Sequence, residues 1–371
     1  MIIADDLSGA CETAAVFGSL PVLLPGFDGV VPADYVTNLG TRELPAGVHR
    51  TQLQKALAAC VAGGTLFVKI DSLLRGHLKM TLTEIVELGR PVLFSPALPE
   101  LDRHVREGTL FVGGMRLDQT GLWEREPRPA PACLADLLTD LPHVITTVDR
   151  LDEVLRPGIV AIVDLESAEQ AAVAARIAAQ HDAVLAGASA LASGLATTIP
   201  PFEPALDDLG PARKIVVAVG SASAAAVRQL EVLTEALGAS AVLITEEGPA
   251  DGLDPSTGLA VLAFSHGGEL FPDAGSLLLT RMSEAVEKLA AHQDVDIVVI
   301  GGETAGAVLP RLGISRLDVL REVHPGAVVS VAGRRLVATR PGSFGDDTSL
   351  LQIVQAIREI RNPTREEPSD E

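Results

Sequence analysis

Short apolar runs alternate with amphipathic stretches along most of this chain, and this alternation most limits the folds open to it. Val92–Ser95, Ile159–Asp164 and Ala183–Ala186 are apolar runs bounded by Gly, Pro or Asp, as is typical of buried strands. Ala168–Gln180 is rich in alanine and has apolar residues at helical spacing. Because strands alternate with helices, we expect an α/β fold with mostly parallel sheets flanked by helices.

A proline-rich segment interrupts the alternation. Residues 199–212 contain four prolines and show no strand or helix period, which is typical of a linker. Since 371 residues exceed what one hydrophobic core usually supports, we predict two domains, at residues 1–200 and 213–362, with a linker at residues 201–212. The acidic end, residues 363–371, is expected to be disordered.

The second half repeats the alternation. Its predicted strands are Lys214–Gly220, Ser240–Thr245, Val261–Ser265, Val295–Ile300 and a strand pair around Val328–Thr339. Its predicted helices are Ala222–Leu237, Gly275–His292, Glu303–Leu312 and Thr348–Arg361.

Three corners that contain glycine follow predicted strands of the second half and precede helices: Gly220–Ser223, Gly301–Thr304 and Pro341–Gly345. Glycine lets the backbone approach a ligand, and a helix N-terminus favours phosphate. Because open α/β sheets bind ligands at the carboxyl ends of strands, we predict a nucleotide site, with a ligand-free tight turn as the alternative at each corner. The Walker and G-x-G-x-x-G patterns are absent. The candidate residues are Ser221, Ser223, Gly301, Gly302, Glu303, Thr304, Arg340, Gly342 and Gly345.

Side chains at these corners have distinct expected roles. Arg340 is placed to meet a phosphate, and Thr304 could add a hydroxyl contact. Glu303 could contact a nucleotide sugar or the water shell of a metal ion. Asp346 or Asp347 is expected to cap the following helix.

Two adjacent carboxylates open the first half. Asp5 and Asp6 follow a very short apolar run and precede the helical stretch Ala10–Phe17. Adjacent side chains diverge, so we expect one carboxylate to point into a strand-end crevice and the other to cap the helix. There an aspartate could accept hydrogen bonds from substrate hydroxyls or take a proton from an attacking alcohol. The short run also predicts either a frayed first strand or a start site upstream of Met1.

A second group of charged residues follows the predicted strand Leu66–Ile70, which delivers Lys69, Asp71, Ser72 and Arg75. Arg75 suits capture of a carboxylate by two parallel hydrogen bonds. Lys69 lies in an apolar strand and therefore needs a partner such as Asp71 or a ligand. A structural ion pair is the alternative.

Composition excludes several classes of function. A formal net charge of −20 without a basic run argues against nucleic-acid binding. No apolar window is long enough for a membrane span, and no secretion signal is present, so a cytoplasmic protein is expected. The three cysteines show no metal-binding spacing, which predicts reduced thiols. A G-x-S-x-G elbow, which a serine hydrolase would use, is absent.

Taken together, these residues resemble the four-carbon acid sugar kinase family. The order and spacing of the matching segments are more specific than any single one, and they run from Ala4 to about Ile360. The segments are A-D-D-L-S-G-A (Ala4 to Ala10), K-I-D-S-L-L-R-G (Lys69 to Gly76), Ser95 to Arg103, A-G-A-S-A-L-A (Ala186 to Ala192), Val219 to Leu230, G-G-E-T-A-G-A (Gly301 to Ala307) and P-G-S-F-G (Pro341 to Gly345).

The resemblance implies an N-terminal domain that binds a sugar acid, a C-terminal domain that binds ATP with Mg²⁺, and an active site in the cleft between them. The implied reaction phosphorylates the terminal hydroxyl of threonate, erythronate or 3-oxo-tetronate, with a homodimer as one possible assembly. The implied catalytic residues are Asp5, Asp6 and Arg75, and the implied substrate-binding residues are Lys69, Asp71, Ser72 and Arg103.

Two departures from the family pattern keep other functions open. Arg340-Pro341 replaces the usual Lys-Ser, and Leu73 replaces a usual threonine. A catalytically weak or inactive protein of the same fold that binds a sugar acid and a nucleotide is therefore the main alternative. A phosphate-dependent oxidoreductase is less favoured because the dinucleotide pattern is absent.

Overall fold

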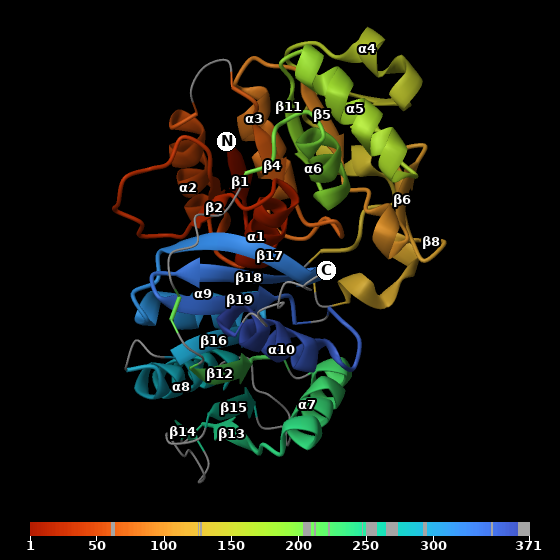
Figure 1. Ribbon diagram of the computed structural model, residues 1–371. Coiled ribbons are helices and arrows are strands. Elements are labelled where there is room, and N and C mark those ends of the chain that lie inside the picture. The colour runs from red at the N-terminus through yellow and green to blue at the C-terminus, as the bar shows by residue number, and fades with distance from the viewer. Residues whose placement is uncertain are drawn as a thin grey trace, which may run out of the picture. The chain divides into compact units, whose positions relative to one another are not determined.

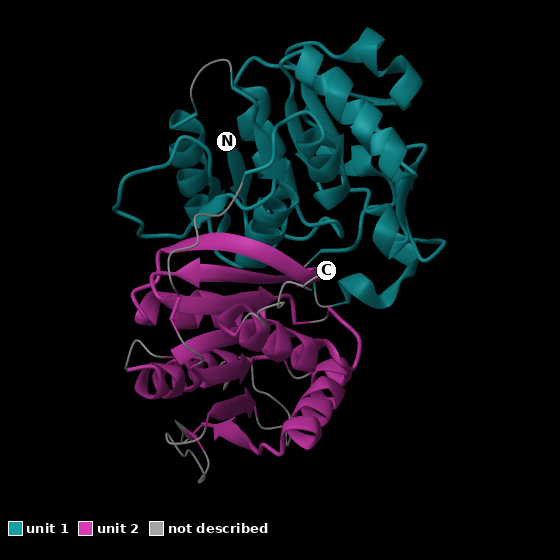
Figure 2. Cartoon of the chain, in the orientation of Figure 1, with its two compact units in different colours: residues 1–202 teal, residues 203–371 magenta. Residues whose placement is uncertain are grey.

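The chain forms two compact units, Met1–Phe202 and Glu203–Glu371 (Figure 2). The computed structural model describes residues 1–60, 64–124, 126, 128–202, 209–210, 213–221, 223–246, 248–249, 258–264, 274–291, 295–342 and 344–362. Most of the predicted linker and all of the predicted disordered tail lie outside these residues. Within them, no helix has both the length and the apolar character needed to cross a membrane.

The first unit is built on a parallel sheet with the strand order β2-β3-β1-β4-β11-β5-β10-β9 (Figure 1). Its strands are β1 (Ile2–Ala4), β2 (Pro21–Leu23), β3 (Val36–Asn38), β4 (Phe67–Lys69), β5 (Val92–Ser95), β9 (His143–Thr146), β10 (Val160–Val163) and β11 (Val184–Gly187). β1 pairs on both sides, with β3 and β4, so the opening of the chain lies inside the sheet.

Helices flank this sheet, and a separate three-stranded antiparallel sheet, β6-β7-β8, lies beyond β5 in the chain. The helices are α1 (Leu7–Val16), α2 (Ala46–Ala58), α3 (Leu78–Val86), α4 (Leu151–Val154), α5 (Ala168–Gln180) and α6 (Ser189–Ala196). The small sheet consists of β6 (Arg103–Arg106), β7 (Thr109–Val112) and β8 (Met115–Arg116). Short 3₁₀ helices are η1 (Pro99–Leu101), η2 (Leu117–Gln119), η3 (Gly121–Trp123), η4 (Leu134–Leu138) and η5 (Val148–Arg150).

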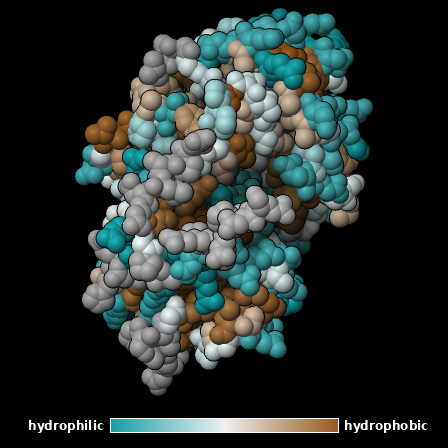
Figure 3. Space-filling view, viewed as in Figure 1, coloured by the Kyte–Doolittle hydropathy of each residue, from teal (hydrophilic) through white to brown (hydrophobic). Residues whose placement is uncertain are grey.

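Local sequence explains α5 well. Ser167 accepts a hydrogen bond from the Gln170 backbone N–H and so caps the helix N-terminus. The buried side is lined by alanines at helical spacing, from Ala171 to Ala178, which lets the helix pack closely. The surface over α4 and α5 is largely hydrophilic in Figure 3. β5 and α5 have the predicted bounds, which confirms those two predictions.

The second unit is also α/β. Its sheet has the order β14-β13-β15-β12-β16-β19-β18-β17, in which β13, β15, β12, β16 and β19 are parallel and β14 and β18 run antiparallel to their neighbours. The strands are β12 (Lys214–Val219), β13 (Ala241–Thr245), β14 (Gly248–Pro249), β15 (Leu259–Phe264), β16 (Val295–Ile300), β17 (Arg316–His324), β18 (Ala327–Ala332) and β19 (Arg335–Arg340). The helices are α7 (Ala224–Leu237), α8 (Ala274–Leu289), α9 (Gly302–Arg311) and α10 (Ser349–Arg361).

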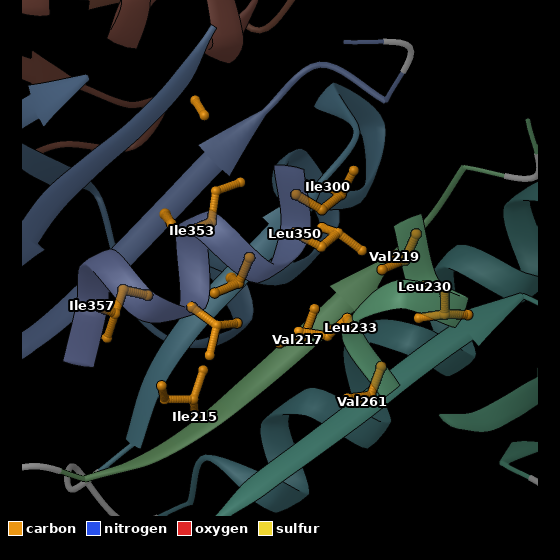
Figure 4. Packing of buried hydrophobic residues seen from close by; sticks show 14 of the residues in the cluster. Ile215, Val217, Val219, Leu230, Leu233, Val261, Ile300, Leu350, Ile353 and Ile357 are labelled. Atoms are coloured by element: carbon orange, nitrogen blue, oxygen red, sulfur yellow. The ribbon is translucent and has the colours of Figure 1, made fainter. Parts of the chain in front are cut away.

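A buried hydrophobic cluster holds this second sheet to two of its helices. Val217 of β12 lies between Leu233 of α7 and the apolar face of α10, which includes Ile353 and Ile357 (Figure 4). Ser223 caps the start of α7 by accepting from the Ala226 backbone N–H. The carboxyl ends of β12, β16 and β19 are thereby fixed at one edge of the sheet.

The fold differs from the sequence prediction where strands are short or polar. The predicted strand pair around Val328–Thr339 is the hairpin β18–β19, and the sequence did not predict the third antiparallel strand, β17, which alternates charged and apolar residues. The three-residue strands β2 and β3 were also missed, because three residues carry too little periodicity. Ser265, the predicted end of the strand β15, and His292, the predicted end of α8, lie outside the described residues.

Candidate functional site

Arg42 joins the two aspartates that follow β1. Its Nη2 lies 2.6 Å from Asp5 Oδ1 and 2.8 Å from Asp6 Oδ1, and its Nε donates to Asp5 Oδ2 at 3.0 Å. Burial lowers the pKa of Arg42, but the charges of Asp5, Asp6 and Asp71 outweigh this effect and raise it. The guanidinium is thus a fixed positive charge at the carboxyl end of β1.

The two aspartates have different environments, as their adjacent positions predict. Both Asp5 oxygens bond to Arg42, whereas Asp6 Oδ1 also accepts from the Gly9 backbone N–H and caps α1. Among the described residues no donor bonds to Asp6 Oδ2. Burial raises the pKa of Asp6, Arg42 opposes this shift, and Asp5 adds to it. Asp6 therefore combines an open oxygen with an increased affinity for a proton.

Asp71 and Arg75 form the structural ion pair that the sequence left as an alternative. Arg75 Nε and Nη2 each lie 2.8 Å from an Asp71 oxygen, and Asp71 Oδ2 also accepts from the backbone N–H groups of Leu73 and Arg75. Burial would raise the pKa of Asp71, but hydrogen bonds from Arg75 and the charge of Arg42 hold it well below its usual range. The fork of Arg75, which was predicted to take a substrate carboxylate, is occupied within the protein.

Lys69 meets a different acid from the one that the sequence suggested. Its Nζ lies 3.4 Å from Glu12 Oε2 on α1, while the other Glu12 oxygen accepts from Ser189 Oγ at 2.5 Å. Lys69 and Ser189 are both buried. This chain of contacts joins the ends of β4 and β11 through α1.

Arg103, at the start of β6, contacts Ser72 directly. Its Nη1 donates to Ser72 Oγ, and its buried Nε has no hydrogen-bond partner. Among the described residues it forms no ion pair. Burial lowers the pKa of Arg103, while the nearby Asp71 carboxylate counteracts this effect. Arg103 is therefore a cation with bonding capacity left over, beside Ser72.

A buried histidine braces the loop that carries Arg42. His49 Nδ1 lies 2.7 Å from Thr41 Oγ1, and its Nε2 lies 2.9 Å from Thr81 Oγ1. The Thr41 backbone N–H in turn donates to the Asp5 carbonyl. Burial, helped by the nearby His77, lowers the pKa of His49 to about 4.

This lowered pKa predicts a loss of stability in mild acid. Because the unfolded state, with a histidine pKa near 6.5, binds more protons than the folded state, the free energy of unfolding falls as pH drops from about 6.5 to about 4. At about 1.4 kcal/mol per pKa unit, the full contribution is about 3 kcal/mol. Urea unfolding across this range should show a smaller slope in His49→Gln, whose amide does not titrate. An unchanged slope would contradict the assignment.

In the second unit the three predicted corners converge at the ends of β12, β16 and β19. A Cβ on Gly342 would lie 3.0 Å from Ser221 Cβ and 3.8 Å from Gly301 Cα. A Cβ on Gly220 would lie 1.6 Å from Thr304 Oγ1, so only glycine fits there. Residues separated by more than 100 positions in the chain thus form one small glycine-lined junction.

Some side chains at this junction already have partners within the protein, whereas others are exposed. Ser223 caps α7, and Thr304 is buried against Gly220. Gly301, which precedes α9, has φ 108°, a conformation suited to glycine. Glu303 is exposed in the first turn of α9, and within the described part of the chain its carboxylate has no partner.

The structure places Arg340 beneath the last corner instead of at its surface. The side chain is 0% exposed, with Nη2 donating to Gln229 Oε1 at 2.8 Å and Nη1 donating to Ser349 Oγ at 2.5 Å. Burial lowers the pKa of Arg340 to about 10. Asp346 accepts from the backbone N–H of Thr348, which is itself the N-cap residue of α10. The prediction that Asp346 or Asp347 caps this helix is therefore wrong, and Asp347 pairs with Arg228.

Sequence reasoning missed three residues of the first-unit cluster. Arg42 lies in a loop after β3, and its bond to Asp6 spans 36 residues. Glu12 faces Lys69 from α1, and Ser189 starts α6 directly after β11. A signal existed for Ser189, which lies in the segment A-G-A-S-A-L-A after a predicted strand. Arg42 and Glu12 had none, because their roles depend on strand order.

Comparison with known proteins also assigns different roles to the two units. Residues 1–195 match the family of sugar-binding N-terminal domains, and residues 228–350 match the family of nucleotide-binding C-terminal domains. A D-threonate kinase from Cupriavidus necator is 30% identical to this chain, over 98% of this chain and 99% of its own length. The chain belongs to the four-carbon acid sugar kinase family.

Other members of this family extend the comparison. A 3-oxo-tetronate kinase from Methylobacterium radiotolerans is 27% identical, over 92% of this chain and 95% of its own length. A crystal structure of a Haemophilus influenzae protein superposes with a TM-score of 0.72 at 20% identity, covering 96% of this chain and 99% of that one. That likeness establishes the shared fold.

Proposed function

We propose that this protein is an ATP-dependent kinase that phosphorylates the terminal hydroxyl of a four-carbon sugar acid. The observation that carries the proposal is an open base and an open cation in one strand-end cluster: Asp6 has a free oxygen, and Arg103 forms no ion pair among the described residues. A hydroxy acid needs both, since its hydroxyl loses a proton and its carboxylate must be held. The named relatives support this substrate class.

On the substrate side, Arg103 takes the role first given to Arg75. Arg103 holds the carboxylate together with Ser72, and Asp6 accepts the proton of the attacking hydroxyl. Lys69 contributes positive charge near the reacting group, held by Glu12. Arg75 and Asp71 shape the loop after β4 and act on the substrate through that loop.

On the nucleotide side, backbone N–H groups at the three glycine corners hold the phosphates of ATP. Phosphoryl transfer depends mainly on positioning and on stabilising charge, which such corners supply. Mg²⁺ usually takes one or two protein carboxylates together with phosphate oxygens. Glu303 is exposed in the first turn of α9, has no partner among the residues that the structure describes, and fits that requirement.

A binding protein of the same fold without turnover is the second candidate. One observation favours it: the cation expected at the last corner, Arg340, is buried among neutral partners. Loss of a surface cation would weaken the stabilisation of charge during transfer while leaving nucleotide binding to the backbone.

An ADP-release assay with ATP, Mg²⁺ and a panel of threonate, erythronate and 3-oxo-tetronate tests the proposal. The kinase releases ADP with at least one acid. Thermal stabilisation by ATP without turnover of any acid would favour the binding protein. Stabilisation by a nicotinamide cofactor but not by ATP would overturn both.

If Arg103 holds the substrate carboxylate, lysine variants of Arg103 and Arg75 should differ: the first should raise KM, and the second should lower stability. Arg103→Lys loses roughly 1.5–3 kcal/mol of charge-assisted hydrogen bonding, so KM for the sugar acid should rise about 10- to 150-fold with little change in unfolding. Arg75→Lys is the matched control: it should lower the free energy of unfolding by roughly 1–3 kcal/mol, because buried Asp71 loses its fork. Steady-state kinetics and urea unfolding measure both. A raised KM in Arg75→Lys together with a loss of stability in Arg103→Lys would instead show that Arg75 holds the carboxylate.

The proposal also covers the cellular compartment and the oligomeric state of the enzyme. Within the described part of the chain, Cys11, Cys60 and Cys133 form no disulfide, which fits a reducing compartment such as the cytoplasm. A homodimer stays a prediction, which light scattering on the purified protein would test.

A further inference from the structure

Gln229, on α7, is a buried amide whose side chain bonds to the last glycine corner and to Arg340 just before it. Its side chain is 0% exposed. Nε2 donates to the carbonyls of Phe344 and Gly345, at 3.2 and 3.1 Å, and Oε1 accepts from Arg340 at 2.8 Å. One side chain thus satisfies two loop carbonyls and the Nη2 group of the buried Arg340 guanidinium, whose Nη1 bonds to Ser349.

The loop that Gln229 holds has little freedom elsewhere. Gly345 has φ 83°, and a Cβ there would lie 2.4 Å from Ser349 Oγ and 2.8 Å from Arg340 Nη1. On the opposite side, Phe344 packs so closely on the β17–β18 turn that a Cβ on Gly326 would lie 2.7 Å from its ring. The loop is therefore clamped between α7, Arg340 and a hairpin turn.

The same clamp sets the geometry of the proposed phosphate site. Gln229 lies about 1.7 turns along α7 from its N-cap residue, Ser223. A Cβ on Gly342 of the loop would lie 3.0 Å from Ser221, two residues before that cap. Arg340, meanwhile, has only neutral contacts among the described residues, so its charge is left without an acidic partner. An anion bound at the corner above would supply the missing countercharge.

We propose that Gln229 is the positioning residue of the nucleotide site: it holds Phe344 and Gly345 of the last corner against α7, with Arg340 as a buried cation beside them. This inference rests on the proposed function, and it adds a residue that does not touch the nucleotide. The two carbonyl bonds fix the loop, and the Arg340 bond keeps its guanidinium in place.

Two variants separate this role from a general effect on folding or charge. Gln229→Met has nearly the same length but no hydrogen bonds and no charge. Gln229→Glu keeps the acceptor for Arg340 but cannot donate to the two carbonyls. Both should raise KM for ATP by at least tenfold and weaken ATP binding measured by calorimetry without sugar acid. KM for the sugar acid, at saturating ATP, should stay within about twofold. Glu231→Gln, a surface change on the same helix, serves as the control.

The outcomes are decisive in either direction. Weakened ATP binding in both variants, with sugar-acid KM retained, supports the proposal. If Gln229→Met does not fold, Gln229→Glu, which keeps the Arg340 bond, carries the test. Unchanged ATP binding in a folded variant overturns the proposal, as does a parallel rise of both KM values. If both variants fold, an effect confined to Gln229→Glu also overturns it, because such an effect would reflect charge alone. Wild-type protein that neither binds ATP nor releases ADP would instead refute the proposed function.

Discussion

Replacing Asp6 with asparagine is expected to lower kcat by about 10²- to 10⁴-fold in a protein that still folds. Asparagine is as good a helix cap as aspartate, so it can still accept from the Gly9 backbone N–H at the start of α1. It cannot take a proton, however, and the open Oδ2 of Asp6 is the proposed acceptor. ADP release at saturating substrates measures kcat, and urea unfolding measures stability.

The raised pKa of Asp6 sharpens this test. Because the base must be unprotonated, kcat/KM should fall on the acidic side of the pKa of Asp6, at a higher pH than an ordinary aspartate would give. Asp5→Asn is the matched control, and it should mainly lower stability, since both Asp5 oxygens bond to Arg42. A greater loss of kcat in Asp5→Asn than in Asp6→Asn would reverse the assignment.

Gly342→Val should abolish the stabilisation of the protein by ATP. The new Cβ would lie 3.0 Å from Ser221 Cβ and 3.1 Å from Ser221 Oγ, and the valine methyl groups would fill the junction where the three corners meet. At an ATP concentration 100 times the dissociation constant, the wild-type protein gains about 2.7 kcal/mol, and the variant should gain none. Thermal denaturation with and without ATP measures the difference.

A sugar acid should still raise the melting temperature of Gly342→Val, because its proposed site lies in the other unit. Gly306→Val, on α9, is the control: nothing lies within 4 Å of a Cβ there, and valine suits a helix better than glycine does. Retained stabilisation by ATP in Gly342→Val would refute the junction as the phosphate site.

Where an element is long and regularly patterned, its sequence was enough to predict it. α5 is capped by Ser167 and buries alanines on one side, and both features are local, so its bounds matched the prediction. The mostly parallel topology also followed from the alternation of strands and helices. β2, β3 and β17 were missed: two of them have three residues, and the third alternates charged with apolar side chains.

The candidate site, too, could be predicted from the sequence only in part. Asp5, Asp6 and the glycine corners could be predicted as candidates because each follows an apolar run or a predicted strand, and Lys69 because it lies near the end of one. Parallel strands bring these ends to one edge. The partner of each side chain could not be identified. Arg75 had equal reason to bind a substrate carboxylate or Asp71, and the distance of four residues across a tight turn decided for Asp71.

By itself, then, the sequence determined the class of fold, the positions of the strand-end loops and the residue types in them, because these depend on periodicity and turn chemistry within about ten residues. Tertiary structure alone decided which charges pair. Arg42 joins the aspartates, Arg103 bonds to Ser72 without an acidic partner among the described residues, and Arg340 is buried. Each of these outcomes depends on which strands become neighbours and how much water each side chain retains, and the free energy of a charge changes steeply with both. Neither quantity is encoded in any local pattern.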